Sequence, residues 1–302
     1  MNLNPRALCL LLLCSLLANA CSVKLAAIVD KTTAQVETAY RVEKDIAYGA
    51  DKEQTLDLYL AKDATRLKNK NYTVVFLHGG GYYLSDKARE ERYIQPYLKK
   101  GLNVVNLNYR LKRGIPVATE DLTLALNFLA AHRAAYPVRL DRIVLSGFSA
   151  GAHIASMVAV TANDSAYPHP LAPGIRIAGV VNFSGPVGGL NVVEEVFMNN
   201  QVPLLREMGE AFFPASTGYA PKEVVKQYEP LSYFDDQDPP FFIWHGGLDD
   251  QVPPATFEEF VALLGHNSKK NIVLLVPDGR HSPTAAELAA AYSKIFTFLD
   301  NQ

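Results

Sequence analysis

The chain has 302 residues, of which 49% are hydrophobic and 20% are charged, and its formal net charge is −2. This composition excludes a disordered chain, and the charge provides no long-range attraction to nucleic acid or acidic lipid. One large α/β domain is expected at this length, because sheets of that class often exceed the usual domain size. We therefore expect a globular protein with no nucleic-acid partner.

The first 20 residues have the pattern of a secretory signal peptide. Arg6 supplies positive charge near the N-terminus, an apolar run follows, and Ala18-Asn19-Ala20 forms a small-x-small cleavage site. At about a dozen residues the run is too short for a membrane span, which needs roughly 20, so we expect no transmembrane span. A buried N-terminal helix is the alternative, but the Ala-x-Ala ending has no use in a core. We predict removal of residues 1–20 and an exported protein, secreted or periplasmic.

The three cysteines, Cys9, Cys14 and Cys21, all lie at or before the predicted cut. The mature chain therefore has no internal disulfide. Cys21, directly after the cut, resembles the acylated cysteine of bacterial lipoproteins. Those proteins usually carry Leu three residues before the cysteine and a small residue two before, where this chain has Ala18 and Asn19. A lipid anchor at Cys21 therefore stays open beside plain secretion.

Residues 21–39 carry no strong pattern, and we interpret them as an N-terminal arm. Between residues 40 and 60 apolar residues alternate as in strands, on either side of a turn at 48–51. This alternation predicts an N-terminal β-hairpin. We assign residues 40–302 to one domain.

Strands and helices alternate after the hairpin. Short runs of Val, Ile, Leu and Phe predict strands at 73–77, 103–107, 142–145, 177–183, 241–244 and 272–276. Such mainly apolar runs fit a parallel sheet that helices cover on both faces. Apolar periodicity and start signals predict helices at 119–135, 150–162, 256–264 and 284–299. The alternation predicts an α/β fold with one mainly parallel sheet.

The stretch 185–233 breaks this alternation. It is long and rich in Asn, Pro and aromatic residues, and would be an unusual bare loop. We interpret it as a small cap, inserted over the carboxyl edge of the sheet.

Residues 147–151 read Gly-Phe-Ser-Ala-Gly, between a predicted strand and a predicted helix. A serine at such a turn is strained and exposed, and the two glycines let the chain pack closely around it. The N-terminus of the following helix favours developing negative charge. Ser149 is therefore the candidate nucleophile.

Residues 78–81 read His-Gly-Gly-Gly and follow the strand at 73–77. Successive glycines leave main-chain amides bare, which suits the stabilisation of an oxyanion. A flexible turn is the alternative. The position after this strand, one helical unit before the nucleophile, favours the functional interpretation.

An activated serine needs a histidine base and a carboxylate that holds the base. His281 directly follows the last predicted strand, at the edge where open α/β folds bind ligands, and completes the order serine, acid, histidine. We interpret the other six histidines as loop or structural residues: His78, His132, His153, His169, His245 and His266.

The acid is expected after the strand at 241–244, where Asp249 and Asp250 are adjacent. Asp278 is a third choice because it is close to His281 in the chain. Aspartates are also common in turns that have no catalytic role. The residues alone leave the choice open.

Three motifs carry a resemblance to a known family: HGGG at 78–81, GFSAG at 147–151 and HGGLDDQVP at 245–253, followed by His281. Together they resemble the hormone-sensitive-lipase-like and feruloyl-esterase-like carboxylesterases of the α/β-hydrolase superfamily. The resemblance covers residues 40–300 and implies an α/β-hydrolase fold.

The resemblance also implies roles for individual residues. It implies an oxyanion hole formed by the amides of Gly80, Gly81 and Ala150, and it selects Asp249 as the acid. Asn108-Tyr109-Arg110 is similar to a family motif after the next strand. The position after the glycines, often Trp in these enzymes, is Tyr82 here. We assign Tyr82 to substrate binding.

The predicted function is a serine carboxylesterase that hydrolyses a small-molecule ester through an acyl-enzyme on Ser149. Bulky residues in or near the cap predict a short acyl group: Tyr82, Phe212, Phe213 and Tyr219. We expect no cofactor and no metal, since the chain has no His-Glu-x-x-His, Cys pair or phosphate-binding Gly-Lys-Ser/Thr loop. The alternatives are an arylformamidase or peptidase with the same machinery, and a catalytically silent binding module. The oligomeric state is unknown.

Overall fold

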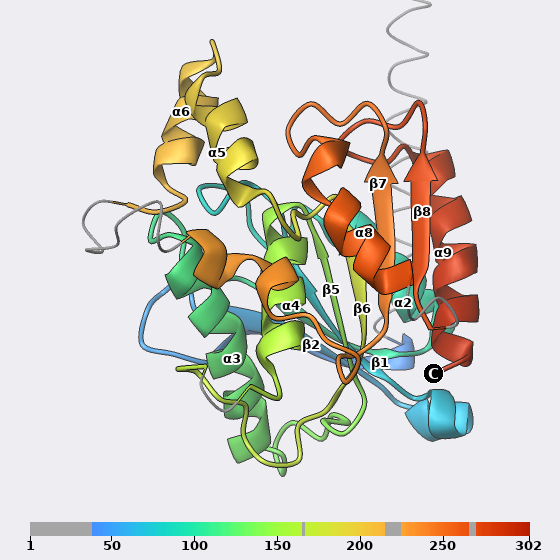
Figure 1. The fold of residues 1–302 in the computed structure, drawn as a ribbon. Coiled ribbons are helices and arrows are strands. Elements are labelled where there is room, and N and C mark those ends of the chain that lie inside the picture. The colour runs from blue at the N-terminus through green and yellow to red at the C-terminus, as the bar shows by residue number, and fades with distance from the viewer. Residues whose placement is uncertain (1–37, 165–166, 215–224, 266–269) are drawn as a thin grey trace, which may run out of the picture. The chain divides into compact units, whose positions relative to one another are not determined.

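The computed structural model describes residues 38–164, 167–214, 225–265 and 270–302 (Figure 1). Its contacts divide the chain into two units, Met1–Arg41 and Val42–Gln302. Only residues 38–41 of the first unit are described, and they include the start of the first strand. The predicted signal peptide and most of the predicted arm lie outside the described residues.

The described residues form one eight-stranded sheet in the order β1-β2-β4-β3-β5-β6-β7-β8. The strands are β1 Tyr40–Ala47, β2 Thr55–Ala61, β3 Thr73–Leu77, β4 Asn103–Leu107, β5 Ile143–Phe148, β6 Ile177–Phe183, β7 Phe241–Gly246 and β8 Ile272–Val276. β2 pairs antiparallel with β4, and the pairings from β4 through β8 are parallel. The predicted N-terminal hairpin and mainly parallel sheet are confirmed.

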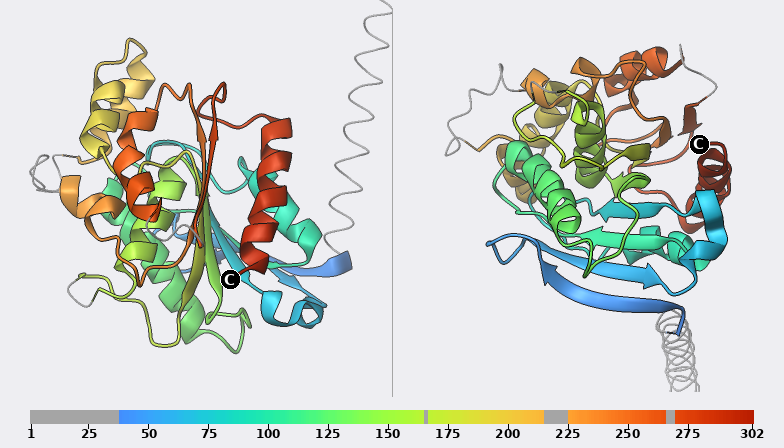
Figure 2. Two further views of the ribbon diagram at one scale, coloured as in Figure 1. Left: turned by 45° about the vertical axis from the view of Figure 1, so that its right-hand side comes forward. Right: turned by 90° about the horizontal axis from the view of Figure 1, so that it is seen from below.

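Helices cover both faces of the sheet. The α-helices described are α2 Glu91–Lys100, α3 Ile115–Ala131, α4 Ala150–Thr161, α5 Leu190–Met198, α6 Pro203–Glu210, α8 Glu258–Gly265 and α9 Ala285–Asp300. Short 3₁₀ helices are η1 Ala64–Lys70, η3 Val225–Tyr228, η4 Pro230–Ser232 and η5 Pro254–Thr256. Figure 2 shows α3, α4 and α8 on one face and α2 and α9 on the other.

Outside the segment 185–233, two helices depart from the predictions. Helix α3 begins at Ile115 rather than at 119, because Pro116 is tolerated in a first turn, where its missing N–H is not needed. Helix α2 was not predicted, because Pro96 inside it obscures the helical pattern. It still buries one apolar face, and Gly101 ends it in the left-handed conformation (φ 82°).

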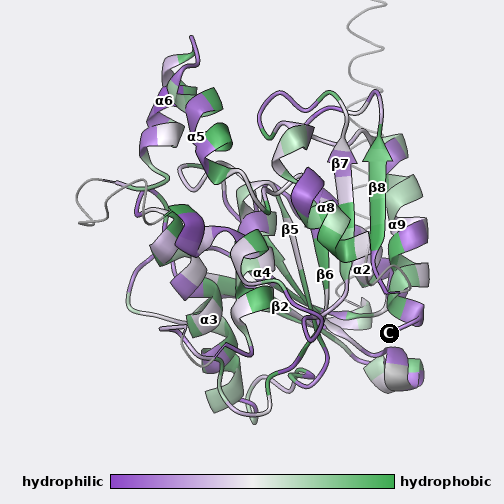
Figure 3. Ribbon diagram, viewed as in Figure 1, coloured by the Kyte–Doolittle hydropathy of each residue, from purple (hydrophilic) through white to green (hydrophobic). Residues whose placement is uncertain are grey.

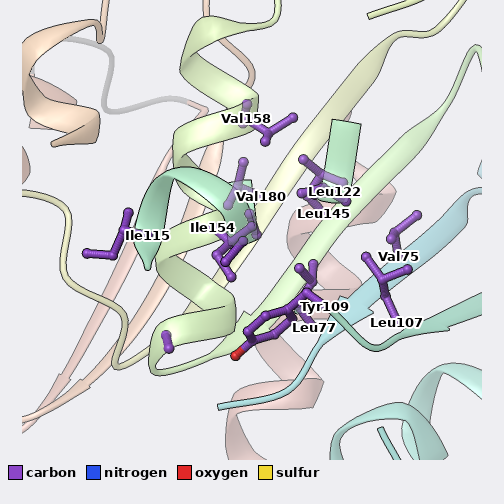
Figure 4. Close-up of a cluster of buried hydrophobic side chains, with 14 of the residues drawn as sticks. Val75, Leu77, Leu107, Tyr109, Ile115, Leu122, Leu145, Ile154, Val158 and Val180 are labelled. Atoms are coloured by element: carbon purple, nitrogen blue, oxygen red, sulfur yellow. The ribbon is translucent and has the colours of Figure 1, made fainter. Parts of the chain in front are cut away.

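The part of the core next to the predicted site residues lies between the sheet and helices α3 and α4 (Figure 4). Helix α4 is buried along its whole length. Side chains from the central strands meet those from the two helices, among them Val75, Leu77, Leu145, Val180, Leu122, Ile154 and Val158. Full burial of one such side chain stabilises the fold by about 1.5–3 kcal/mol. This packing fixes the carboxyl ends of β3 and β5, where two of the predicted motifs follow.

The edge strand β8 is hydrophobic along its length (Figure 3) but is not covered on both faces. Val273 is 36% exposed and Leu275 is 49% exposed. One face of this edge strand is therefore partly open to solvent.

The segment 185–233 contains α5 and α6, then residues 215–224 outside the described part, then η3 and η4. In Figure 1, α5 and α6 lie beyond the ends toward which the strands point. Helices α5 and α6 therefore lie at the carboxyl edge of the sheet, and the interpretation of 185–233 as a cap stays a prediction.

Candidate active site

The predicted site residues meet at the carboxyl edge of the sheet. Ser149 directly follows β5, and the glycine turn directly follows β3. Asp249 lies just after β7, and His281 lies in the loop after β8. Four parallel strands therefore deliver these residues to one edge, the place where ligands bind in open α/β sheets.

Ser149 occupies a strained turn between β5 and α4. Its φ of 52° and ψ of −121° are rare for a residue with a side chain, and such a conformation costs about 1–3 kcal/mol. Its amide donates to the carbonyl of Phe183 at 2.8 Å. A Cβ atom on Gly147 or on Gly151 would overlap main-chain atoms, so no larger residue fits at either position. The two glycines allow the close packing that holds the serine in this conformation.

A continuous hydrogen-bond chain joins Ser149, His281 and Asp249. The imidazole Nε2 of His281 lies 2.9 Å from Ser149 Oγ, and its Nδ1 lies 2.8 Å from Asp249 Oδ2. An ionised carboxylate can only accept, so Nδ1 carries the hydrogen and Nε2 accepts from the serine hydroxyl. The side chains of His281 and Asp249 are both largely buried.

Asp249 is held as a carboxylate. Burial by itself would raise its pKa, but hydrogen bonds from His281 and from the amides of Val252 and Gln251 bring the pKa below its ordinary value. The other two aspartates considered from the sequence, Asp250 and Asp278, are exposed. Of the three, Asp249 is the one that contacts the imidazole of His281.

A second imidazole, His245, also lies near Asp249. Its Nε2 is 3.4 Å from Asp249 Oδ2 and donates to the carbonyl of Val252 at 2.8 Å. Burial lowers the pKa of His245 and so favours its neutral form. A neutral His245 does not compete with His281 for the negative charge of Asp249. We interpreted His245 as structural, and its contacts agree with that role.

The glycine turn after β3 presents main-chain amides without protein acceptors. Gly80 and Gly81 have φ values of 105° and 57°, a region that favours glycine. Within the described residues, the amides of Gly80, Gly81 and Ala150 donate to no protein group. The turn after β3 and the turn after β5 therefore present three amides that have no protein acceptor within the described residues.

Neighbouring side chains support this turn. The hydroxyl of Tyr109 donates to the carbonyl of His78 at 3.0 Å, and the two rings stack at 4.4 Å. Met208 of helix α6 packs against Gly81 so closely that a Cβ there would overlap its methyl group. Tyr109 belongs to the Asn-Tyr-Arg motif, and this contact gives the motif a physical reason.

Tyr82 is buried rather than open to solvent. The residue is 2% exposed, and its hydroxyl lies 2.8 Å from Nδ1 of His153. The hydroxyl is therefore occupied by a protein partner and not free for a substrate. The assignment of Tyr82 to substrate binding stays a prediction.

Sequence reasoning missed Ser184. It follows β6, has a φ of 54°, and donates from its hydroxyl to the main-chain carbonyl of His281 at 2.7 Å. Its position as the first residue after a central parallel strand is a signal that points to the same edge as Ser149. His153 was interpreted only as structural, although it lies one helical turn after Ser149.

The described ranges contain no group of three or more His, Cys, Asp and Glu side chains arranged to hold a metal ion. Among the same residues we find no helix with the length and hydrophobicity that a membrane span requires. A cavity of about 380 Å³ opens at the opposite, amino-terminal edge of the sheet, beside Arg142, Pro240 and Gln302. None of the predicted site residues lines that cavity.

Comparison with known families identifies the chain. A family model described as BD-FAE matches residues 56–264. The chain belongs to the BD-FAE family. The match to this family includes the glycine turn, Ser149 and Asp249, and it ends before His281.

Individual relatives of this BD-FAE protein are distant. Esterase LipQ of Mycobacterium tuberculosis is 29% identical over 226 residues, which are 73% of this chain and 52% of LipQ. The probable isoprenylcysteine alpha-carbonyl methylesterase ICMEL1 of Arabidopsis thaliana is 27% identical over 246 residues, 80% of this chain and 51% of that protein. The chain spans about half the length of the curated relatives it matches.

Two solved structures match the BD-FAE chain over most of their own length. Esterase B from Lactobacillus rhamnosis has a TM-score of 0.69 and 19% identity, and the match covers 94% of this chain and 95% of that one. A truncated carbohydrate esterase from gut microbiota has a TM-score of 0.67 and 20% identity, with 87% and 98% covered. Together with the strand order, these matches confirm the predicted α/β-hydrolase fold.

Proposed function

We propose that this BD-FAE family member is a serine carboxylic ester hydrolase. The observation that carries the proposal is the hydrogen-bond chain from Asp249 through His281 to Ser149, which ends at a serine in a strained turn. A nucleophile within reach of a base, and a base oriented by a third group, is the geometry of an activated serine. The names of several relatives, which include an esterase and a methylesterase, support the same reaction class.

The proposed mechanism is acyl transfer in two steps. Ser149 Oγ attacks the ester carbonyl carbon while His281 Nε2 takes the hydroxyl proton, and Asp249 stabilises the resulting imidazolium. The oxyanion accepts hydrogen bonds from the amides of Gly80, Gly81 and Ala150. The bond to the alcohol oxygen then breaks, and His281 gives its proton to the leaving alcohol. Water, activated by the same imidazole, hydrolyses the acyl-enzyme and restores the serine.

A short acyl group is the finer part of the proposal. Tyr82 follows the turn of residues 78–81, which we call the oxyanion turn. The ring of Phe212 meets Tyr82 edge-on at 5.2 Å and lies tilted against Phe197 at 5.3 Å, and all three are buried. Phe213 is buried as well, while Tyr219 lies outside the described residues. We propose that this aromatic packing limits the length of the acyl chain. We expect a higher kcat/KM for p-nitrophenyl butyrate than for p-nitrophenyl palmitate, and the reverse order would contradict a short acyl site.

The substrate class is tested by a panel of purified reactions. Hydrolysis of p-nitrophenyl acetate, feruloyl esters, formylkynurenine and a peptide separates an esterase from an arylformamidase and a peptidase with the same machinery. We expect the highest kcat/KM on an ester. A higher value on formylkynurenine or on the peptide would replace the esterase by that alternative. A protein with no turnover of any of these would favour the silent binding module.

We also propose export, with cleavage before Cys21. The support is the sequence pattern of residues 1–20, since that segment lies outside the described residues. Mass spectrometry of the native protein is expected to find a chain that starts at Cys21, and an added acyl mass would identify a lipid anchor. A full-length product in the cytoplasm would contradict the proposal.

A further inference from the structure

A buried histidine connects the oxyanion turn with the inserted segment. His153 has no exposed surface, and its ring nitrogens contact the hydroxyl of Tyr82 at 2.8 Å and the carbonyl of Tyr228 at 2.6 Å. A main-chain carbonyl can only accept, so Nε2 donates to Tyr228 and Nδ1 accepts from the hydroxyl of Tyr82. Burial also lowers the pKa of His153 to about 4, which keeps the ring neutral at ordinary pH.

Tyr82 is a residue whose backbone needs such support. Its φ is 58°, directly after Gly81 at 57°, and a left-handed conformation costs a residue with a side chain about 1–2 kcal/mol. Three contacts hold it there. Its carbonyl accepts from the amide of Lys112 at 2.8 Å, its ring packs edge-on against Phe212, and its hydroxyl donates to His153.

His153 also contacts the nucleophile turn through its main chain. It lies in the first turn of α4, and its amide donates to the carbonyl of Ser149 at 3.0 Å. One residue therefore bonds to the serine turn by its backbone and to the oxyanion turn by its side chain. Both contacts therefore lie between Ser149 and the turn that carries the amides of Gly80 and Gly81.

We propose that His153 is a positioning residue, which sets the oxyanion turn relative to Ser149 through the hydroxyl of Tyr82. This inference rests on the proposed hydrolase function, and His153 itself does not touch the substrate. Without the hydrogen bond, the left-handed turn at Tyr82 relaxes and the glycine amides move away from the developing oxyanion. That loss falls on the transition state more than on the bound ester, so kcat falls while KM changes little.

Two substitutions of His153 separate positioning from simple structural support. The amide oxygen of His153→Asn can occupy the place of Nδ1 and accept from Tyr82. The amide nitrogen of His153→Gln can occupy the place of Nε2 and donate to Tyr228, but leaves Tyr82 without an acceptor. We expect His153→Asn to retain a kcat within about threefold of wild type and His153→Gln to lose roughly tenfold to a hundredfold, below the loss of a whole oxyanion donor.

Tyr82→Phe is the second test of the proposal. It removes only the hydroxyl that donates to His153. Its kcat on p-nitrophenyl acetate is expected to fall by the same factor as that of His153→Gln. The double variant, with both Tyr82→Phe and His153→Gln, is expected to be no slower than either single variant. Circular dichroism and thermal unfolding report whether each variant folds. His132→Gln, at an exposed histidine after α3, is the matched control with unchanged kcat.

Several results would overturn the positioning role. They are a wild-type kcat in Tyr82→Phe, equal kcat losses in the Asn and Gln variants, and additive losses in the double variant. If the Gln variant fails to fold, Tyr82→Phe alone still decides the question. A wild-type protein that hydrolyses no ester would instead contradict the proposed function, so the two failures are distinguishable.

Discussion

The hydroxyl of Ser184 donates a hydrogen bond of 2.7 Å to the main-chain carbonyl of His281. Ser184 directly follows β6, while His281 comes from the loop after β8. The bond therefore ties the loop that carries the proposed base to a central strand of the sheet. Because the hydroxyl contacts the main chain, it acts on the position of the imidazole and not on its chemistry.

Ser184→Ala removes this hydrogen bond, so the carbonyl of His281 loses its donor from Ser184. A hydrogen bond of this kind contributes about 0.5–1.5 kcal/mol to folding stability. Because its loss frees the loop that positions the imidazole, we expect kcat/KM to fall by roughly twofold to tenfold. Steady-state hydrolysis of p-nitrophenyl acetate measures the change. Thr161→Val is the control, since it also removes a buried hydroxyl bonded to a main-chain carbonyl, but at the far end of α4. Equal activity losses in both variants would argue against a specific role for Ser184.

The adjacent pair Asp249 and Asp250 makes a sharp prediction. Asp249 contacts His281 and two amides, whereas Asp250 is exposed. The orienting acid fixes the histidine tautomer, and its loss can lower kcat by about 10⁴. Asp249→Asn is therefore expected to approach the activity of Ser149→Ala, while Asp250→Asn keeps nearly wild-type activity. Severe loss only in Asp250→Asn would show that the acid is the second aspartate, and equal loss in both would show that the loop acts as a structural unit.

The two glycines of the oxyanion turn are expected to differ in their tolerance of a methyl group. A Cβ on Gly80 would overlap the main-chain carbonyl of Leu84, while one on Gly81 would overlap only the flexible tip of Met208. Gly80→Ala is therefore expected to lower kcat more than Gly81→Ala, toward the loss of about 10²–10³ seen when an oxyanion donor is removed. Met208→Ala is expected to restore part of the activity of Gly81→Ala and none of that of Gly80→Ala. A Met208→Ala substitution that rescues both variants, or neither, would contradict this packing.

Acid is expected to destabilise the fold through buried histidines. Burial lowers the pKa of His78 and of His153 from 6.5 to about 4. Between these values the unfolded chain binds protons that the folded chain does not, so the free energy of unfolding falls as the pH drops from 6.5 to 4. Each histidine contributes up to about 3 kcal/mol to this fall. Urea unfolding of wild type and His153→Asn at several pH values is expected to show a shallower pH dependence in the variant. An unchanged pH dependence would contradict the buried neutral state of His153.

The sequence predicted the parts of the fold and site that local patterns encode. The strands β3 and β8 follow from short apolar runs, and β4 and β6 follow from runs that Asn106 and Asn182 interrupt. The turn at Ser149 follows from two glycines between a strand and a helix. Helix α2 was not predicted, because Pro96 interrupts its helical sequence pattern. The helix forms all the same, because the burial of Tyr93 and Tyr97 outweighs the low helix propensity of proline.

Contacts between distant parts of the chain could not be predicted in this way. The choice between Asp249 and Asp250 depends on which side chain of an extended loop faces His281, and only the family resemblance selected one. The bond from Ser184 to His281 joins residues 97 positions apart, and that from Tyr82 to His153 joins residues 71 apart. Such pairs become visible only when the sheet brings the carboxyl ends of its strands together.

The most direct test of the central claim is covalent labelling of Ser149. A fluorophosphonate reacts with a serine only when its hydroxyl is activated, so we expect one adduct per chain, located by peptide mass spectrometry at Ser149. We expect Ser149→Ala to fold normally, to take up no label and to lose nearly all hydrolysis of p-nitrophenyl acetate. A label on another residue, or hydrolysis by Ser149→Ala at the wild-type rate, would contradict the assignment of this chain as a serine hydrolase that acts through Ser149.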